Sequence, residues 1–191
     1  MDYRASAISA AKAVFKNGAP IYVRRSVPAS YDATTGKNAF PGALLNGSIS
    51  ATDTIITLMT STGAWLNVGG VVKVGSEYIY YAYKQGSQLF ECMRGYAGST
   101  PAIQSTGSPV TLTFQDFLGY SIIGGYSDFF INGTSIKAGD KKFTVPASGL
   151  ACIPNQSDKI VDPAGTAYTI INVEQVAPGG VTILYKVQGR K

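Results

Sequence analysis

Short runs of alternating apolar and polar residues recur through the middle of the chain, and this alternation predicts β-strands. The runs are separated by clusters of Gly, Ser, Asn and Asp, which are residues that favour turns. They occupy residues 49–59, 71–75, 77–83, 88–93 and 109–114. Five short strands within about seventy residues predict a small β module.

The same two-residue period returns in the last third of the chain. It occupies Tyr120–Ile123, Phe129–Ile131, Lys142–Val145, Lys159–Val161, Ala167–Glu174 and Thr182–Val187. We expect the last two runs to pair as a hairpin across Pro178–Gly180. Strands of this length, with one helix to cover an open end, predict a small closed or nearly closed barrel. An open sandwich is the competing architecture.

A helical period precedes the strands and runs from Tyr3 to Asn17. Ile8, Ala11 and Phe15 fall on one face of such a helix, which is also rich in alanine. Gly18 supplies a stop at its C-terminal end. Two further elements are expected next along the chain, a strand at Ile21–Val23 and a turn or hairpin tip at Tyr31–Lys37.

Charge divides the chain into two parts. The whole sequence carries 16 cations and 11 anions, but residues 41–108 hold three of each and have no net charge. We therefore predict an inserted β-rich module at residues 41–108, within a discontinuous domain made of residues 1–40 and 109–191. The predicted fold class is all-β, a small β-barrel with an N-terminal α-helix, interrupted by a second small β domain.

Composition excludes most familiar enzyme chemistry. The 191 residues contain no histidine, so histidine-based triads and imidazole metal sites are ruled out. Cys92 and Cys152 have no C-x-x-C partner, and we expect two free, partly buried thiols. Five aspartates adjoin turn residues or strand ends, where aspartate usually caps a turn: Asp116, Asp128, Asp140, Asp158 and Asp162. We expect no catalytic, metal-binding or cofactor-binding residue, and neither a signal peptide nor a membrane span.

The terminal segments resemble tailed-bacteriophage head-closure proteins, the neck or stopper proteins of the head-tail connector. The resemblance covers roughly residues 1–40 and 109–191. It is carried by the helix to Gly18, the strand Ala19–Arg25, the turn Tyr31-Asp32-x-x-Thr35-Gly36, the run Asp158-Lys159-Ile160 followed by Gly165, Tyr168 and Ile170, and the end Val176-x-Pro178-x-Gly180-x-x-x-Leu184-Tyr185.

The inserted segment resembles a small β module found in various phage virion proteins. The likeness rests on Ile55-Ile56-Thr57-Leu58, Val74-Gly75-Ser76-Glu77-Tyr78-Ile79 and Cys92-x-Arg94-Gly95-x-x-Gly98-Ser99-Thr100. That pattern commonly has a histidine where this chain has Gln104, so no role of such a histidine carries over.

The head-closure resemblance implies a structural virion protein rather than an enzyme. Its expected partners are further copies of itself in a cyclic ring, sixfold or twelvefold, together with a portal or adaptor ring and a tail or tail-terminator protein. Such a ring closes the DNA channel after packaging and offers a surface for tail attachment. Non-specific contact with packaged DNA is also expected, whereas a cofactor or a membrane is not. The implied location is the head-tail junction of the virion.

Three groups of residues are candidates for contact with these partners. We expect Arg24, Arg25 and Lys37 to face the channel or the portal, where their charge would lower repulsion between phosphates. The alternative interpretation makes the two arginines solvated charges at a strand end. Gly119, Tyr120, Gly124, Gly125 and Tyr126 form either a gating or interface loop with glycine hinges or a bulged strand.

Aromatic residues define the third candidate surface, in the inserted module. Alternation places Tyr78 and Tyr80 on one face of a strand and Tyr81 and Tyr83 on the other. We expect core packing for at least one face and a partner for the other. Two other functions remain open: a virion surface or fibre-docking protein whose inserted module binds glycan or another virion protein, and a small hydrolase.

Overall fold

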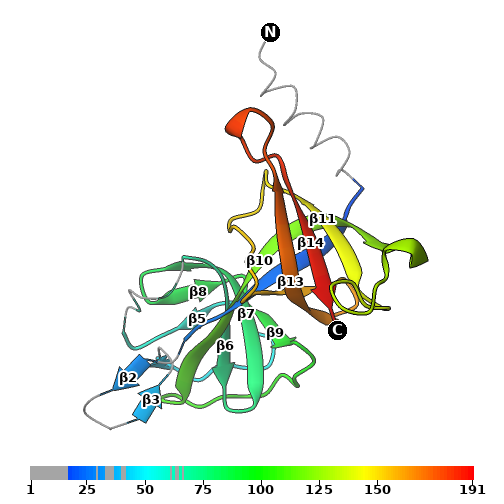
Figure 1. Ribbon diagram of the computed structural model, residues 1–191. Coiled ribbons are helices and arrows are strands. Elements are labelled where there is room, and N and C mark those ends of the chain that lie inside the picture. The colour runs from blue at the N-terminus through cyan, green and yellow to red at the C-terminus, as the bar shows by residue number, and fades with distance from the viewer. Residues whose placement is uncertain are drawn as a thin grey trace. The chain divides into compact units, whose positions relative to one another are not determined.

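The structure is a computed structural model that describes residues 17–28, 30–32, 37–39, 42–60, 62, 65 and 67–191 (Figure 1). Strands account for 53% of it and helices for 4%, so the prediction of a mostly β chain is confirmed. The helix predicted from Tyr3 to Asn17 lies outside the described residues except for Asn17, which is part of a turn. The chain divides into two compact units, Met1–Arg25 with Phe117–Lys191 and Ser26–Asp116.

A closed barrel of six strands forms the first unit. Around the barrel the order is β1, β12, β13, β14, β11 and β10, and β10 pairs with β1 to close the sheet. The bounds are β1 Ala19–Ser26, β10 Pro109–Gly125, β11 Lys141–Pro146, β12 Lys159–Val161, β13 Ala167–Val176 and β14 Leu184–Arg190. Closure confirms the predicted barrel and excludes the open sandwich, because a closed sheet leaves no unpaired edge.

The hairpin expected across Pro178–Gly180 is present. β13 and β14 pair antiparallel from Thr169 with Arg190 to Val176 with Leu184, and Pro178–Gly180 forms a short 3₁₀ turn, η2, at the tip. The register shifts between Ile170 and Asn172, which marks a bulge in β13.

Alternating side chains fill the barrel. On β11, Phe143 and Val145 are fully buried whereas Lys142 is exposed, as the two-residue period of a half-buried strand requires. The barrel core joins eight buried side chains from β1 and β11–β14: Ile21, Phe143, Val145, Ile160, Tyr168, Ile170, Tyr185 and Val187. Burial of this apolar surface is the main term that stabilises the unit.

Among the described residues, the eight strands β2 to β9 and the first half of β10 build the second unit, where β10, β6, β7, β8 and β5 follow one another. In addition β4 pairs with β10, β9 pairs with β7, and β2 and β3 form a separate hairpin. The bounds are β2 Ser30–Asp32, β3 Lys37–Ala39, β4 Gly42–Leu44, β5 Ile56–Thr57, β6 Val68–Val74, β7 Glu77–Gln85, β8 Gln88–Phe90 and β9 Met93–Tyr96. This unit has its own core, which includes Trp65, Ile79, Tyr81 and Leu112.

β10 links the two units as one strand of 17 residues. The sequence pattern predicted two separate runs here, at residues 109–114 and 120–123. It also predicted domain boundaries after residues 40 and 108, whereas the compact units divide after residues 25 and 116. The intervening Gln115–Gly119 is part of the strand, and Asp116, Phe117 and Gly119 within it are buried. The register of β10 against β6 shifts between Leu112 and Phe114.

Two predicted strands differ from the structure. Phe129–Ile131 was expected to be extended, but Asp128–Phe130 forms a 3₁₀ turn, η1, without a partner strand. Residues 49–59 contain only the two-residue strand β5, because Asp53 accepts hydrogen bonds from the amide and hydroxyl of Ser50 and closes a tight turn. Local side-chain hydrogen bonds therefore compete with the sheet in this stretch.

Candidate functional site

Arg25, at the end of β1, is held by an ion pair with Asp158. Its Nε and Nη2 donate to the two carboxylate oxygens, both at 2.8 Å, and Nη2 also donates to the carbonyl oxygen of Ile153 at 2.9 Å. The guanidinium carbon lies 5.7 Å from the centroid of the Phe117 ring. The hydrogen bond to Asp158 raises the pKa of Arg25. This charge is neutralised locally, which reduces its availability to a phosphate.

Arg24 and Lys37 are the other two cations expected to face the channel or the portal. Arg24 is half-buried on β1, and its Cα is paired with that of Lys159 on β12. Lys37 is the first residue of β3. Arg24 and Arg25 belong to the first unit and Lys37 to the second. Their shared role toward DNA or the portal stays a prediction.

Glu77 and Arg94 form a second ion pair, inside the inserted module. Arg94 donates to both carboxylate oxygens of Glu77 at 2.8 and 2.7 Å, and the amides of Gly95 and Ala102 donate to the same carboxylate. Arg94 also donates to the carbonyl oxygen of Ser50. Burial acts to raise the pKa of Glu77, but these hydrogen bonds outweigh it, and the pKa is lowered. Glu77 and Arg94, two of the residues behind the expected likeness to a virion module, therefore have a structural role in this chain.

Asp140 and Arg190 form a third pair, in the barrel unit. Arg190 donates to both oxygens of Asp140 at 2.8 Å, and Gln188 donates to one of them at 2.7 Å. The hydrogen bond from Arg190 is the main cause of a strongly lowered pKa at Asp140, with the Lys137 amide adding to it. The carboxylate is thus held ionised as part of the fold, unlike a general acid, which needs a raised pKa.

Two further candidate aspartates, Asp116 and Asp162, also accept hydrogen bonds, and Asp128 begins the short turn η1. Asp116 accepts a hydrogen bond of 2.6 Å from the hydroxyl of Tyr96, and Asp162 accepts from the amides of Ala164 and Thr166 in a turn. Among the described residues, no group of three or more Cys, Asp or Glu side chains is placed to hold a metal ion. Both thiols are free, with Cys92 buried and Cys152 half-buried.

The aromatic strand of the module is β7, and its two faces differ in burial. Tyr81 and Ile79 are fully buried in the core. Tyr78 and Tyr80 are half-buried, and Tyr80 packs against Tyr96 with their ring centroids 5.4 Å apart. The Tyr81 face is therefore core, while the Tyr78 and Tyr80 face is partly covered by neighbouring rings.

Tyr83, at the end of β7, borders an open hollow of about 510 Å³. Its ring stacks on that of Phe90 with centroids 5.0 Å apart and an interplanar angle of 7°. Ile55 and Met93 add exposed apolar surface, and Glu91 is among the residues that line the hollow. A hollow with an aromatic pair and one polar group is typical of a small-molecule or peptide subsite.

The segment expected to be a gating loop or a bulged strand lies in β10 and just beyond it. Gly119, Tyr120, Gly124 and Gly125 belong to the strand, and the ladder with β11 runs without a register shift from Ile122 to Gly125. Gly119 is buried, and a Cβ there would lie 3.0 Å from Leu150. Tyr126 follows the strand, and burial raises its pKa.

The outer face of β10 carries a stripe of large apolar side chains. Leu118, Tyr120 and Ile122 are 45–50% exposed, while Gly119 and Ser121 between them are buried. Ser121 donates to the carbonyl oxygen of Thr144. Small residues inside and large apolar residues outside reverse the usual pattern of a barrel strand. We name Leu118, Tyr120 and Ile122 the β10 stripe.

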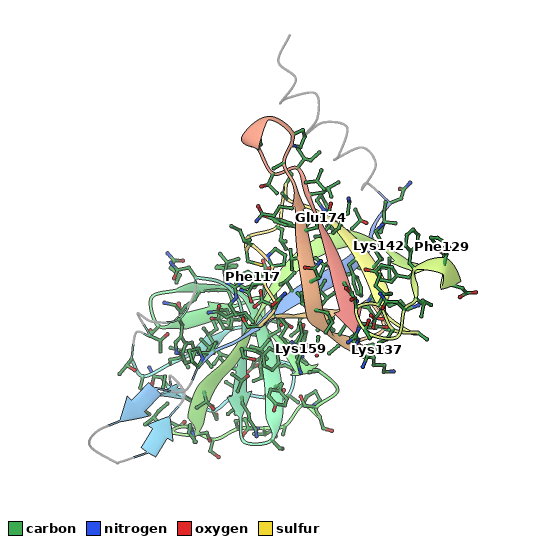
Figure 2. The ribbon with its side chains drawn as sticks, in the orientation of Figure 1. Phe117, Phe129, Lys137, Lys142, Lys159 and Glu174 are labelled. Atoms are coloured by element: carbon green, nitrogen blue, oxygen red, sulfur yellow. The ribbon has the colours of Figure 1, made fainter. Side chains whose placement is uncertain are left out.

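Two further apolar features lie near the ends of the β10–β11 ladder. Phe129 and Phe130 of η1 are 90% and 59% exposed, with their rings edge to face at 5.5 Å, and Figure 2 shows Phe129 on the loop beyond β10. An open hollow of about 340 Å³ is lined by Gly119, Tyr120, Pro146, Ser148, Gly149 and Leu150. We name these the aromatic knob and the β11 hollow.

Comparison with protein-family models, with curated proteins and with solved structures found no match to this chain. Within the part of the chain that the structure describes, no helix has the length and apolarity needed to cross a membrane. The functional conclusion therefore depends on the site itself.

Sequence reasoning did not identify the β10 stripe, the knob or the two hollows. The alternation of Leu118, Tyr120 and Ile122 was visible, but apolar residues at alternate positions normally predict an inward face. These three residues face outward because the small residues between them, Gly119 and Ser121, are the ones that face the barrel interior. The exposed Phe129 and Phe130 were assigned to a strand, where one ring would be covered.

Proposed function

We propose that this chain is a structural subunit of a ring in the neck of a tailed phage, between the portal or adaptor and the tail. The ring closes the DNA channel after packaging and offers the tail its attachment surface. The observation that carries this proposal is the reversed β10 strand, whose large apolar side chains lie on the outer wall of a closed barrel. Such a wall is suited to contact between neighbouring subunits.

Closure of the barrel supports the same role. A closed sheet has no free edge for strand addition, so neighbours must meet through side chains of its outer wall. A cyclic ring of six or twelve copies needs a contact in which one face meets a different face of the next copy. The aromatic knob and the β11 hollow, at separate places on the barrel, offer two such faces.

The role is mechanical rather than enzymatic. Asp140 and Asp158 are committed to arginines, and Asp116 and Asp162 to local hydrogen bonds. A glycosidase would need two carboxyl groups flanking a cleft, one with a raised pKa. These four aspartates instead serve the fold, which favours a structural protein.

Loss of the chain from infected cells tests the proposed role. Without it, heads should package DNA, then lose it, and remain without tails. Complementation with the intact chain should restore tailed particles that retain DNA. Tailed, DNA-filled particles formed in its absence would contradict the proposal.

A second candidate function is supported by the hollow beside Tyr83. The stacked pair of Tyr83 and Phe90, with Glu91 also lining the hollow, fits a surface protein whose module binds a glycan or a segment of another virion protein. Tyr83→Ala should abolish such binding without unfolding the module, because Tyr83 lies at the exposed end of β7. Binding of a glycan panel that Tyr83→Ala left unchanged would remove this candidate.

A further inference from the structure

The aromatic knob and the β11 hollow lie beyond opposite ends of the same ladder. Gly125 pairs with Lys141 at the end that leads to the knob, and Ile122 pairs with Thr144 farther along, toward Tyr120 and Pro146 at the hollow. A strand rises about 3.3 Å per residue, so Tyr120, which lines the hollow, and Gly125, after which the chain leads to the knob, lie about 17 Å apart along β10. The knob of one chain thus follows the Gly125 end of β10, opposite the end at which its own hollow lies.

We propose that Phe129 and Phe130 of one copy seat in the β11 hollow of a second copy, beside Tyr120. This contact is the repeating head-to-tail joint of the assembly, and in that respect the inference rests on the proposed ring. The occupant is a second copy of this chain because the chain itself carries both halves of the joint, at separate places on one barrel.

The volumes of the two halves match. A cavity of about 150 Å³ holds one benzene ring, so two phenyl rings need about twice that volume. The hollow measures about 340 Å³ and is lined largely by apolar or small residues. Its mouth adjoins Tyr120, which allows an offset or edge-to-face contact with an entering phenylalanine ring.

The β10 stripe extends the contact beyond the knob. Leu118 and Ile122 flank Tyr120 on the same outer face, so a neighbour seated at the hollow also covers these side chains. Stable interfaces bury on the order of 1,200–2,000 Å², and two aromatic side chains supply only roughly 300–500 Å² on their side. One joint is therefore weak, and ring closure or a template is required for a stable assembly.

A one-sided pair of variants tests the joint. Phe129→Ser with Phe130→Ser removes the knob and leaves the hollow, whereas Tyr120→Glu with Ser148→Glu blocks the hollow and leaves the knob. Sedimentation of the full chain at high concentration should show self-association weakened at least tenfold in each variant alone. Mixed together, the two variants should form one-to-one pairs that grow no further. Ile103→Ser, which removes an exposed side chain of the other unit, is the matched control.

Disulfide trapping detects the contact between copies even if their association is too weak to be measured by sedimentation. Phe130→Cys and Ser148→Cys, placed on separate chains and mixed under mild oxidation, should cross-link to a dimer, whereas either variant alone should not. Absence of this cross-link at millimolar concentration would overturn the joint, as would unchanged self-association of the knob variant.

The joint and the ring function fail in distinguishable ways. Virions whose neck ring forms normally from the knob variant would sink the joint and leave the function standing. Cross-linked dimers of a chain located elsewhere in the particle would keep the joint and sink the neck assignment. Capture of the knob by a portal or tail protein, with no cross-link between copies, would also count against the joint.

Discussion

Arg25 and Asp158 lie 133 residues apart in the sequence and are joined by two hydrogen bonds of 2.8 Å. Asp158 is fully buried and Arg25 about one third exposed. The pair connects the first barrel strand to the turn that precedes β12, so it joins the beginning of the barrel to its C-terminal part. Arg25, which the sequence predicted to face the channel or the portal, therefore also stabilises the barrel through its ion pair with Asp158.

Replacement of Arg25 by alanine should lower the free energy of unfolding by about 2–4 kcal/mol, because it leaves the buried carboxylate of Asp158 without its partner. Asp158→Ala in the same chain should recover part of this loss, giving a coupling energy of at least about 1 kcal/mol in a double-mutant cycle. Denaturant unfolding measures both quantities.

The exposed pair of Glu174 and Lys186 is the matched control for that cycle. Its two side chains meet at 2.7 Å but remain largely in water, so their coupling should stay below about 1 kcal/mol. Equal coupling energies for the two pairs would refute the structural role assigned to Arg25.

Stability should fall at acid pH through Asp140. Its pKa is lowered in the folded state, mainly by the hydrogen bond from Arg190, so at low pH the unfolded chain binds the proton more readily. The contribution is complete above the unfolded pKa of about 3.9 and is lost as the pH falls below that value toward the folded pKa. Unfolding measured at pH 6, 4 and 3 should follow this course.

Asp140→Asn should flatten that pH dependence. Glu174→Gln removes an anion from an exposed pair and so makes the same change in net charge, and it should keep the wild-type profile because that pair lies largely in water. A profile of Asp140→Asn as steep as that of the wild type would show that the ion pair with Arg190 does not contribute to acid stability.

Both native thiols should react slowly. Burial raises the pKa of Cys92 and of Cys152 to about 12, so the thiolate is scarce at neutral pH. Alkylation at pH 8 should be slower in the native chain than in the unfolded chain by on the order of 10³-fold, because only the thiolate reacts. Native labelling at the unfolded rate would contradict the burial of these side chains.

Two glycines of the chain should respond in opposite ways to alanine. A Cβ at Gly70 would lie 2.3 Å from the ring of the buried Tyr81, so Gly70→Ala should destabilise the module by about 1–3 kcal/mol. A Cβ at Gly124 meets nothing within 4 Å, so Gly124→Ala should be neutral or slightly stabilising.

Gly124→Ala also tests the hinge interpretation of the β10 end. A stable Gly124→Ala chain that no longer assembles would favour a glycine hinge, whereas normal assembly would favour a plain strand end. Thermal unfolding together with sedimentation separates the two outcomes.

The sequence predicted the strands whose alternation is regular and whose ends carry turn residues. The hairpin of β13 and β14 and the barrel as a whole belong to this group, because a two-residue period and a Pro-Gly-Gly tip are local signals. The η1 turn was mistaken for a strand, since two adjacent phenylalanines have high β propensity and the missing partner strand is a tertiary fact.

The candidate sites were harder to predict for a different reason. Partners such as Asp140 and Arg190 are 50 residues apart, and no local pattern marks them as a pair. The outward face of β10 depends on which neighbours fill the barrel, and its apolar residues look inward-facing when only their spacing is known. Exposure of Phe129 likewise follows from the position of η1 and not from its own sequence.

Cryo-electron microscopy of virions that carry this chain tests the central claim most directly. The account predicts a ring of six-stranded barrels between the portal and the tail, with the η1 loop of each copy directed at the β11 hollow of its neighbour. Density for the chain at any other place in the particle, or its absence from the particle, would contradict the account.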